Sequence, residues 1–217
     1  SLAFNANGQG ARIIAHRGVH TAAPENSVAS LKASGELGVW GSEFDIRLTS
    51  DGECVICHNP SYAGDGRAIK DTPYAALSDV RLSNGEPAPT LDSFLETAAA
   101  YPGLTLVCEL KRQGGDSLNR RLFDVAWEKV CRHGMQERTV FQTFAYPLCR
   151  YIKQMVPDAV VFYLCSKEAS LKTAAQLAAD RIDGANYSAS VWTAHPDWPA
   201  EFHRCGLTAI VTAQDDP

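Results

Sequence analysis

The chain has 217 residues, which fits one large domain or two small ones. Hydrophobic residues make up 45% of it and charged residues 21%, so the chain can bury a sizeable core and is not disordered. Its net charge of −5, with no basic run and no apolar stretch near the roughly 18 residues that span a bilayer, argues against a nucleic-acid binder, a membrane-surface binder and a transmembrane protein.

Short apolar strands alternate with amphipathic helices along the whole chain. Asn26 is expected to be the N-cap of the first helix, and Gly38 to end it. In chain order the sequence predicts strand 12–18, helix 27–37, strands 40–49 and 53–58, helix 91–100, strand 104–111, helix 118–133, strand 139–144, helix 146–156, strand 160–165, helix 168–181, strand 184–188, helix 196–205 and strand 207–213.

This order predicts a parallel sheet in a single domain, 1–217. A (β/α)8 barrel competes with a doubly wound sheet, although about 250 residues is more typical of the barrel. The Asp-Gly turn at 51–52 is a hairpin signal. Segment 53–58 is therefore expected to be an excursion from the second strand and not a strand of the barrel.

Carboxylates lie at the ends of two apolar strands. Glu43, Asp45 and Arg47 share one face of strand 40–49, and Glu109 and Lys111 share one face of strand 104–111. Unpaired carboxylates there would repel each other and be costly to desolvate, and a divalent cation such as Mg²⁺ or Ca²⁺ removes both problems. The alternatives are a solvated strand face with Arg47 as counter-ion, and a surface ion pair between Glu109 and Lys111.

Two histidines also end apolar strands. His16 precedes Arg17 and Gly18 after the first strand, and His58 follows segment 53–58. Each alone could be a hydrogen-bonded structural residue. Together they offer a general acid and a general base near neutral pH. With a hard cation, Arg17 and Lys111 to hold a phosphate, the set fits metal-assisted cleavage of a phosphodiester.

The order of these motifs resembles the glycerophosphodiester phosphodiesterase family, and in particular its bacterial branch. The resemblance rests on H-R-G at 16–18, P-E-N-S at 24–27, E-F-D at 43–45, T-S-D-G at 49–52, His58 and E-L-K at 109–111. It is close over 16–111 and weaker from there to the end. The family is a TIM barrel that hydrolyses glycerophosphodiesters to glycerol 3-phosphate and an alcohol.

The resemblance implies a role for each site residue. His16 and His58 would be the acid–base pair, Glu43, Asp45 and Glu109 the ligands of one Mg²⁺ or Ca²⁺ ion, and Arg17 and Lys111 the phosphate-binding residues. The glycerol 2-hydroxyl would attack phosphorus in line while one histidine removes its proton and the other protonates the departing alkoxide. Water would then open the cyclic phosphate. Asn26, in the P-E-N-S motif, is also placed near the site.

The chain departs from the family pattern at three places. Asn59 stands where the family has Asp, which alters the orientation or the pKa of His58. The family's W-T-V-N motif corresponds to V-T-A-Q at 211–214, without the tryptophan. The family continues with a further helix and strand where this sequence stops at Pro217. If 1–217 is the whole protein, we expect an open edge between the first and last strands. The favoured explanation is a C-terminal segment missing from the sequence, and the alternatives are another chain or a rearranged strand that covers the gap.

Two other functions compete with a glycerophosphodiesterase. One is a phospholipid-headgroup phosphodiesterase of the same superfamily, similar to sphingomyelinase D or phospholipase C. The other is a degenerate barrel that binds without catalysis.

The seven scattered cysteines, an odd number, exclude a full disulfide framework and slightly favour the cytoplasm, although a periplasmic or secreted protein after signal removal remains an alternative. The sequence leaves the oligomeric state and the choice of alcohol open.

Overall fold

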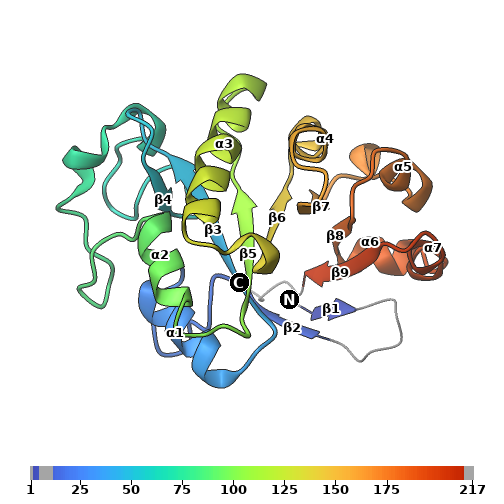
Figure 1. The fold of residues 1–217 in the computed structure, drawn as a ribbon, viewed down its shortest axis with the longest axis horizontal. Helices are drawn as coiled ribbons and strands as arrows, with labels where there is room; N and C mark the ends of the chain where they lie inside the picture. The colour runs from blue at the N-terminus through green and yellow to red at the C-terminus, as the bar shows by residue number, and fades with distance from the viewer. Residues whose placement is uncertain (1, 5–11, 213–217) are drawn as a thin grey trace. The chain divides into compact units, whose positions relative to one another are not determined.

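A computed structural model describes residues 2–4 and 12–212 of the chain (Figure 1). Strands and helices alternate along it, as the sequence predicts. The chain divides into two compact units, which are described separately below. One unit comprises residues 15–139, and the other comprises residues 1–14 and 140–217.

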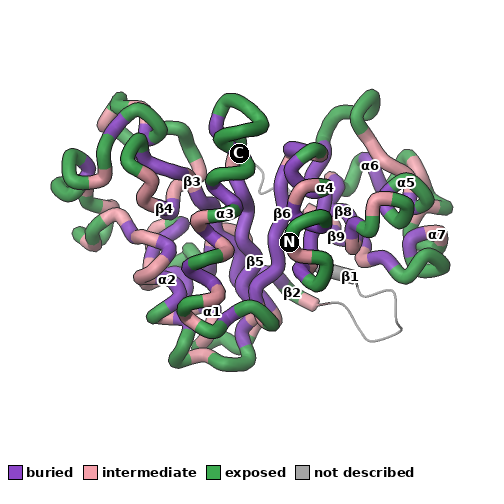
Figure 2. Tube along the Cα trace, turned by 45° about the horizontal axis from the view of Figure 1, so that its top comes forward, coloured by how far each residue is buried: buried purple, intermediate pink, exposed green. Residues whose placement is uncertain are grey.

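The unit of residues 15–139 is built on two parallel strands, β3 (Gly41–Leu48) and β5 (Thr105–Leu110). The short strand β4 (Cys54–Ile56) pairs antiparallel with the end of β3, which confirms the predicted hairpin excursion. Figure 2 shows β3 and β5 buried along most of their length, beneath helices with exposed outer faces. The helices are α1 (Val28–Leu37), α2 (Leu91–Ala98) and α3 (Asp116–Arg132), with short 3-10 helices η1 (Ile69–Asp71), η2 (Tyr74–Leu77) and η3 (Gln136–Arg138).

The start of α1 differs from the prediction. Ser27, not Asn26, is the N-cap, because its hydroxyl accepts a hydrogen bond from the Ser30 amide and the Ser30 hydroxyl accepts one from the Ser27 amide in return. The C-cap is Gly38 as expected, in the left-handed conformation with φ 72°. Asn26 is therefore free for another contact, described with the site below.

Apolar side chains from the strands and from α2 form the core of this unit. Phe44 on β3 and Phe94 on α2 are both almost fully buried, and their rings meet edge to face with centroids 5.1 Å apart. The alternate residues of β3 thus anchor one face in the core. The period of two along the strand then directs Glu43 and Asp45 to the opposite face.

The other unit contains four parallel strands with helices between them. The strands are β6 (Thr139–Thr143), β7 (Val160–Cys165), β8 (Gly184–Ser188) and β9 (Thr208–Thr212), paired in chain order. The helices are α4 (Tyr146–Met155), α5 (Ala174–Ala179), α6 (Ala189–Ala194) and α7 (Trp198–Arg204). The predicted helix 168–181 is divided into a 3-10 turn, η4 (Glu168–Ser170), and α5, and α6 was not predicted.

The edge of this unit also differs from the prediction. Strand β1 (Leu2–Phe4) pairs antiparallel with β9 on one side and with β2 (Arg12–Ala15) on the other. Leu2 is in register with Val211 and with Ile13. The expected open edge between the first and last strands is therefore wrong for the described residues, and the alternative of a rearranged strand is observed. Residues 213–217, which include half of the altered V-T-A-Q motif, lie outside the described residues.

Two further observations bear on the sequence analysis. All seven cysteines are free, and four of them are buried. Within residues 2–4 and 12–212, no helix combines the length and the apolar character that crossing a membrane requires.

Candidate active site

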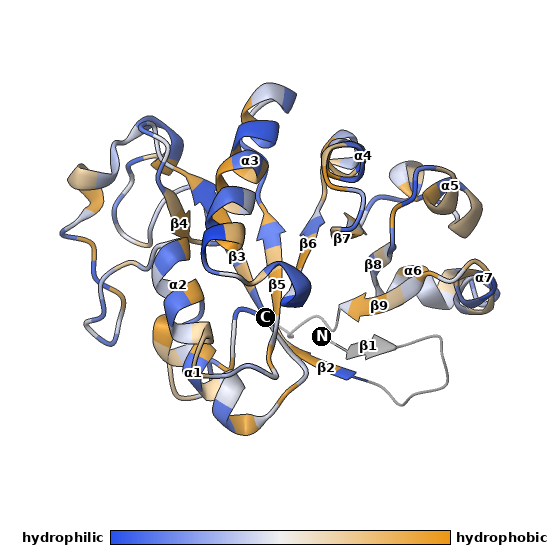
Figure 3. Ribbon diagram, in the orientation of Figure 1, coloured by the Kyte–Doolittle hydropathy of each residue, from blue (hydrophilic) through white to orange (hydrophobic). Residues whose placement is uncertain are grey.

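Three carboxylates from β3 and β5 meet on one face of this pair of strands. The parallel register sets Asp45 directly opposite Glu109, and Glu43 lies two residues earlier on the same face of β3. Figure 3 shows β5 changing from hydrophobic to hydrophilic at this end. All three residues are buried, and one carboxylate oxygen from each lies within 4.8 Å of the others. The predicted cluster is thus formed by the pairing of the two strands.

The electrostatics of the cluster are unfavourable for three negative charges. Burial, and then the charges of Asp45 and Glu109, raise the pKa of Glu43 well above its usual value. Burial and the contact with Asp45 raise the pKa of Glu109 to about 8. Burial alone would raise the pKa of Asp45 as well, but its contacts with Glu109, Lys111 and Asn26 lower it to about 2. Without a further positive charge, the cluster retains protons at neutral pH.

The turn after β2 brings His16 and Arg17 to Glu43. The Arg17 amide donates a hydrogen bond to Glu43 Oε2 over 2.9 Å, and His16 Nε2 lies 3.9 Å from the same oxygen. Arg17 and Gly18 both have positive φ, 55° and 80°. A side chain at Gly18 would clash, because its Cβ would come 2.4 Å from Ser30 Oγ. The H-R-G motif is therefore a tight turn packed on α1 that directs His16 and the Arg17 amide toward the carboxylates.

Asn26 holds Asp45 in place. Its side-chain amide donates to Asp45 Oδ2 over 2.9 Å, and its Oδ1 accepts from the Asp45 backbone amide over 3.2 Å. Asn26 is buried and has φ 54°, a left-handed conformation that asparagine tolerates better than most residues. The sequence pattern indicated a helix cap, and only its place in the P-E-N-S motif pointed to the site.

Two cations flank the carboxylates. Lys111 Nζ lies 3.4 Å from Asp45 Oδ1 and also contacts Glu109 Oε2. Arg17 Nη1 donates to Glu25 Oε2 over 2.6 Å, while its Nε lies 4.0 Å from Asp45 Oδ2. Arg17 Nε is buried and has no hydrogen-bond partner, so it is a donor that an anion could use. The pairing of Arg17 with Glu25 was not predicted from the sequence.

His58 stands at the end of the excursion formed by β4. Its Nδ1 is 2.8 Å from Asn59 Oδ1, and Arg47 donates to its backbone carbonyl from Nε over 3.2 Å and also from Nη2. Arg47 thus fixes the backbone of His58 and is not a counter-ion on a solvated strand face. Partial burial lowers the pKa of His58, an effect that the contact with Asn59 opposes. Asp45, Lys111 and Arg17 are all close enough to influence that pKa.

The structure brings the sequence-predicted residues together in the unit of residues 15–139. The carboxylates form the centre, with His16 and Arg17 contacting them from the turn after β2, Lys111 from the end of β5, and His58 half-buried nearby. Three buried oxygen donors with only partly compensated charge fit a hard divalent cation such as Mg²⁺ or Ca²⁺. Two imidazoles and two cations beside them fit acid–base chemistry on an anion.

Comparison with known proteins supports this interpretation of the site. The family model of the glycerophosphoryl diester phosphodiesterase family matches residues 16–212. A glycerophosphodiester phosphodiesterase of Caldanaerobacter subterraneus is 28% identical over 166 residues, which are 70% of this chain and 67% of the relative. An uncharacterized protein of Bacillus subtilis, YqiK, is also 28% identical over 166 residues, which cover 69% of this chain and 66% of its own. The match thus spans about two thirds of both bacterial relatives.

Solved structures of similar proteins show the fold. A glycerophosphodiester phosphodiesterase from Parabacteroides distasonis is 32% identical, with a TM-score of 0.89 over 95% of this chain and 85% of its own. An Oleispira antarctica phosphodiesterase, solved in complex with the product sn-glycerol-3-phosphate, is 27% identical with a TM-score of 0.81, over 94% of this chain and 85% of its own. The chain therefore has the α/β TIM-barrel fold of these proteins.

Proposed function

The chain belongs to the glycerophosphoryl diester phosphodiesterase family and is a phosphoric diester hydrolase, and on this premise we propose that it cleaves glycerophosphodiesters to glycerol 3-phosphate and an alcohol with the help of one divalent cation. The observation that carries the proposal is the buried carboxylate cluster, flanked by two imidazoles and two cations. The family model runs through both compact units, so we also propose that they form one catalytic domain.

Arg17 and Lys111 bind the phosphate of the substrate. The unpartnered Nε of Arg17 supplies a buried donor, and Glu25 holds the guanidinium from the other side. Burial lowers the pKa of Lys111, but the negative charges of Glu109 and Asp45 outweigh this effect and raise it overall. Lys111 therefore keeps its positive charge throughout the physiological range. These two residues fix the phosphorus atom near the imidazoles, which is the positioning that in-line displacement requires.

Glu43, Asp45 and Glu109 hold the cation, which we propose to be Mg²⁺ or Ca²⁺. A bound divalent ion supplies positive charge that stabilises the negative charge developing on the phosphate oxygens. Asn26 keeps Asp45 oriented through two hydrogen bonds, and the Arg17 amide does the same for Glu43. Three hydrogen bonds from residues outside the donor set therefore orient the donors.

His16 and His58 move the protons. One imidazole takes the proton of the glycerol 2-hydroxyl as it attacks phosphorus, and the other gives a proton to the oxygen of the departing alcohol. In the second half of the reaction the roles reverse, as water opens the cyclic phosphate. Partial burial lowers the pKa of His58, which favours its neutral form, and a phosphodiester anion beside it would raise that pKa again.

Release of glycerol 3-phosphate tests this proposal. Purified protein is incubated with several glycerophosphodiesters after treatment with EDTA, with and without added Mg²⁺ or Ca²⁺. Product that requires the added metal, and that falls by roughly 10²–10⁴-fold in His16→Ala and His58→Ala, supports the proposal. His133→Ala is the control, because this histidine pairs with Asp92 on α2 and lies outside the cluster.

Three outcomes would contradict the proposal. Full turnover without any divalent metal would show that the reaction does not need the carboxylate cluster as a metal site. Activity on phospholipid vesicles, together with no activity on glycerophosphodiesters, would favour the phospholipid-headgroup alternative. Metal binding without turnover on either substrate would favour the non-catalytic barrel.

A further inference from the structure

A pocket of about 420 Å³ adjoins the catalytic cluster on the side of His58. Its walls come from the loop that leads into α1, from the segment that follows β4, and from residues 80–83. His58 and Asn26 line it, whereas His16, Lys111 and the three carboxylates do not. The pocket thus lies beside His58 and Asn26 but outside the residues proposed to hold the phosphate and the cation, and its volume is that of a small-molecule site.

Tyr62 gives this pocket an unsatisfied polar group. The side chain is buried, with 6% of its surface exposed, and its hydroxyl has no hydrogen-bond partner. The ring packs in a hydrophobic cluster with Val55, Ile69 and Leu77, and Tyr62 is also one of the residues that line the pocket. A buried hydroxyl without a partner is costly, and such groups are usually satisfied by a ligand or by water.

The charges around the pocket disfavour a cationic ligand. Glu25 is the one carboxylate among the residues that line it, and that carboxylate is 2.6 Å from the Arg17 guanidinium. Arg81 also lines the pocket. Its Nη1 donates to the backbone carbonyls of Ser78 and Val80, and these neutral contacts do not compensate its charge. Ser61 and Ser83 add further neutral hydrogen-bonding groups.

We propose that this pocket binds the alcohol half of the glycerophosphodiester, that Tyr62 and Arg81 determine which alcohol is accepted, and that the preferred class is a neutral polyol such as glycerol or inositol. The inference rests on the proposed function. In an in-line displacement the attacking and departing oxygens lie on opposite sides of phosphorus. The glyceryl half supplies the attacking hydroxyl, and the departing alcohol therefore extends away from it, beside His58 and into the pocket.

Substrate preference tests the inference. Values of kcat/KM are measured with glycerophosphoinositol, glycerophosphoglycerol and glycerophosphocholine for the wild type, Tyr62→Phe and Arg81→Glu. We expect the two polyol substrates to be preferred over glycerophosphocholine. Tyr62→Phe is expected to lower kcat/KM for the polyol substrates by about 3- to 10-fold, the effect of one neutral hydrogen bond, and to leave glycerophosphocholine unchanged. Arg81→Glu is expected to shift the preference toward choline by about 10-fold.

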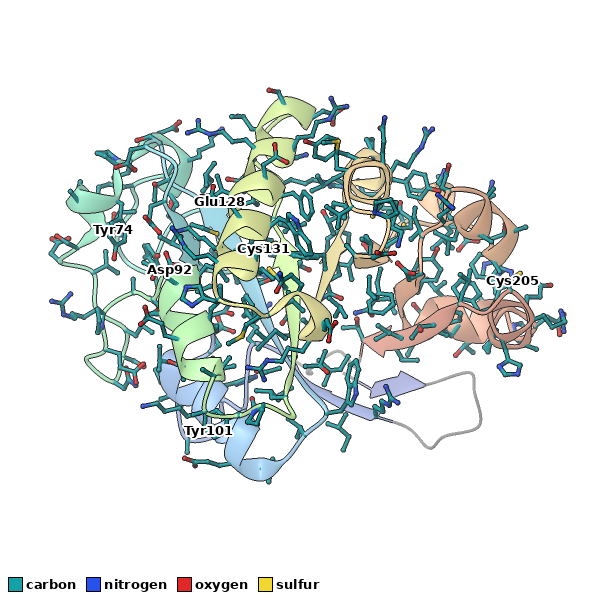
Figure 4. The ribbon with its side chains drawn as sticks, viewed as in Figure 1. Tyr74, Asp92, Tyr101, Glu128, Cys131 and Cys205 are labelled. Atoms are coloured by element: carbon teal, nitrogen blue, oxygen red, sulfur yellow. The ribbon has the colours of Figure 1, made fainter. Side chains whose placement is uncertain are left out.

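Tyr74→Phe is the matched control. Figure 4 shows Tyr74 on η2, at the outer edge of the same segment, and it packs partly against the same hydrophobic cluster without lining the pocket. This variant should behave as the wild type with all three substrates. Tyr62→Phe should not lower the melting temperature, because it removes a hydroxyl that has no partner in the protein.

Three results would overturn the inference while the proposed function stands: a wild-type preference for glycerophosphocholine, an equal loss with all substrates in Tyr62→Phe, or no change in that variant with any of them. An equal loss of kcat/KM with all three substrates would mean that the pocket binds the glyceryl half, which the substrates share. A wild-type protein that releases no glycerol 3-phosphate from any of the three would refute the proposed function, and this inference with it.

Discussion

Replacing Asn59 by Asp tests how the neighbouring side chain sets the pKa of His58. In the structure the neutral Asn59 Oδ1 lies 2.8 Å from His58 Nδ1, and the pKa of the imidazole is lowered by partial burial. A carboxylate in the same position would favour the imidazolium form, because it adds a negative charge beside the ring. We therefore expect Asn59→Asp to raise the pKa of His58.

The size of the effect follows from the geometry. Two opposite unit charges 4 Å apart attract by about 1 kcal/mol in bulk water and by about 4 kcal/mol at the effective dielectric constant typical of pairs near a protein surface. His58 is partly exposed, and solvent screening keeps the interaction near the lower value. Since about 1.4 kcal/mol corresponds to one pKa unit, the pKa of His58 should rise by roughly 1.

The assay combines an NMR titration of His58 with the pH dependence of kcat/KM, for Asn59→Ala, the wild type and Asn59→Asp. The pKa should increase in that order. If the departing alcohol lies beside His58, this residue is the general acid and must be protonated, so the alkaline limb of the pH profile moves to higher pH. A moving acidic limb would make His58 the base and contradict the placement of the alcohol. If the NMR titration shows a shifted pKa for His58 while the pH profile of kcat/KM is unchanged, His58 is neither the general acid nor the general base.

Three further predictions concern the carboxylate cluster and the core. Binding of Mg²⁺, measured by calorimetry, should weaken as the pH falls below about 8, because Glu109 and Glu43 have raised pKa values and must lose their protons to bind a metal; affinity independent of pH between 6 and 8 would contradict this. Asn26→Ala should weaken Mg²⁺ binding by about 10- to 100-fold, and equal binding would show that Asp45 needs no support. Phe44→Ala should lower the free energy of unfolding in urea by about 3–5 kcal/mol, and a loss below about 1 kcal/mol would mean that the ring is not part of a close-packed core.

The candidate site could be predicted largely because strand geometry has a period of two. Alternation along 40–49 assigns Glu43 and Asp45 to one face without any knowledge of the neighbouring strands. The alignment of Asp45 with Glu109 is different, since it depends on the register between two strands about 60 positions apart, and no local pattern specifies that register. The prediction held because β3 and β5 are parallel neighbours and their register sets Asp45 opposite Glu109.

The predictions that failed involve residues with two possible roles or segments too short to show a pattern. Asn26 and Ser27 are both good helix caps, and the choice between them was made by the hydrogen bonds of Asn26 to Asp45, a tertiary contact. Strand β1 has three residues, which is too few for alternation to be recognised, and its partner β9 lies at the other end of the chain. Glu25 was missed because only the folded turn brings it to Arg17.

The hydrophobic cluster around Tyr62 has an evolutionary consequence. Val55, Tyr62, Ile69 and Leu77 give β4 and the segment after it a small core of their own, whereas the carboxylate cluster is held by the pairing of β3 with β5. Substitutions at the rim of that segment, as at Arg81, alter the lining of the pocket without disturbing either support. If the pocket binds the departing alcohol as proposed, drift in this region changes the alcohol that is released while the carboxylate cluster is preserved, so a lineage can acquire new substrates one rim residue at a time.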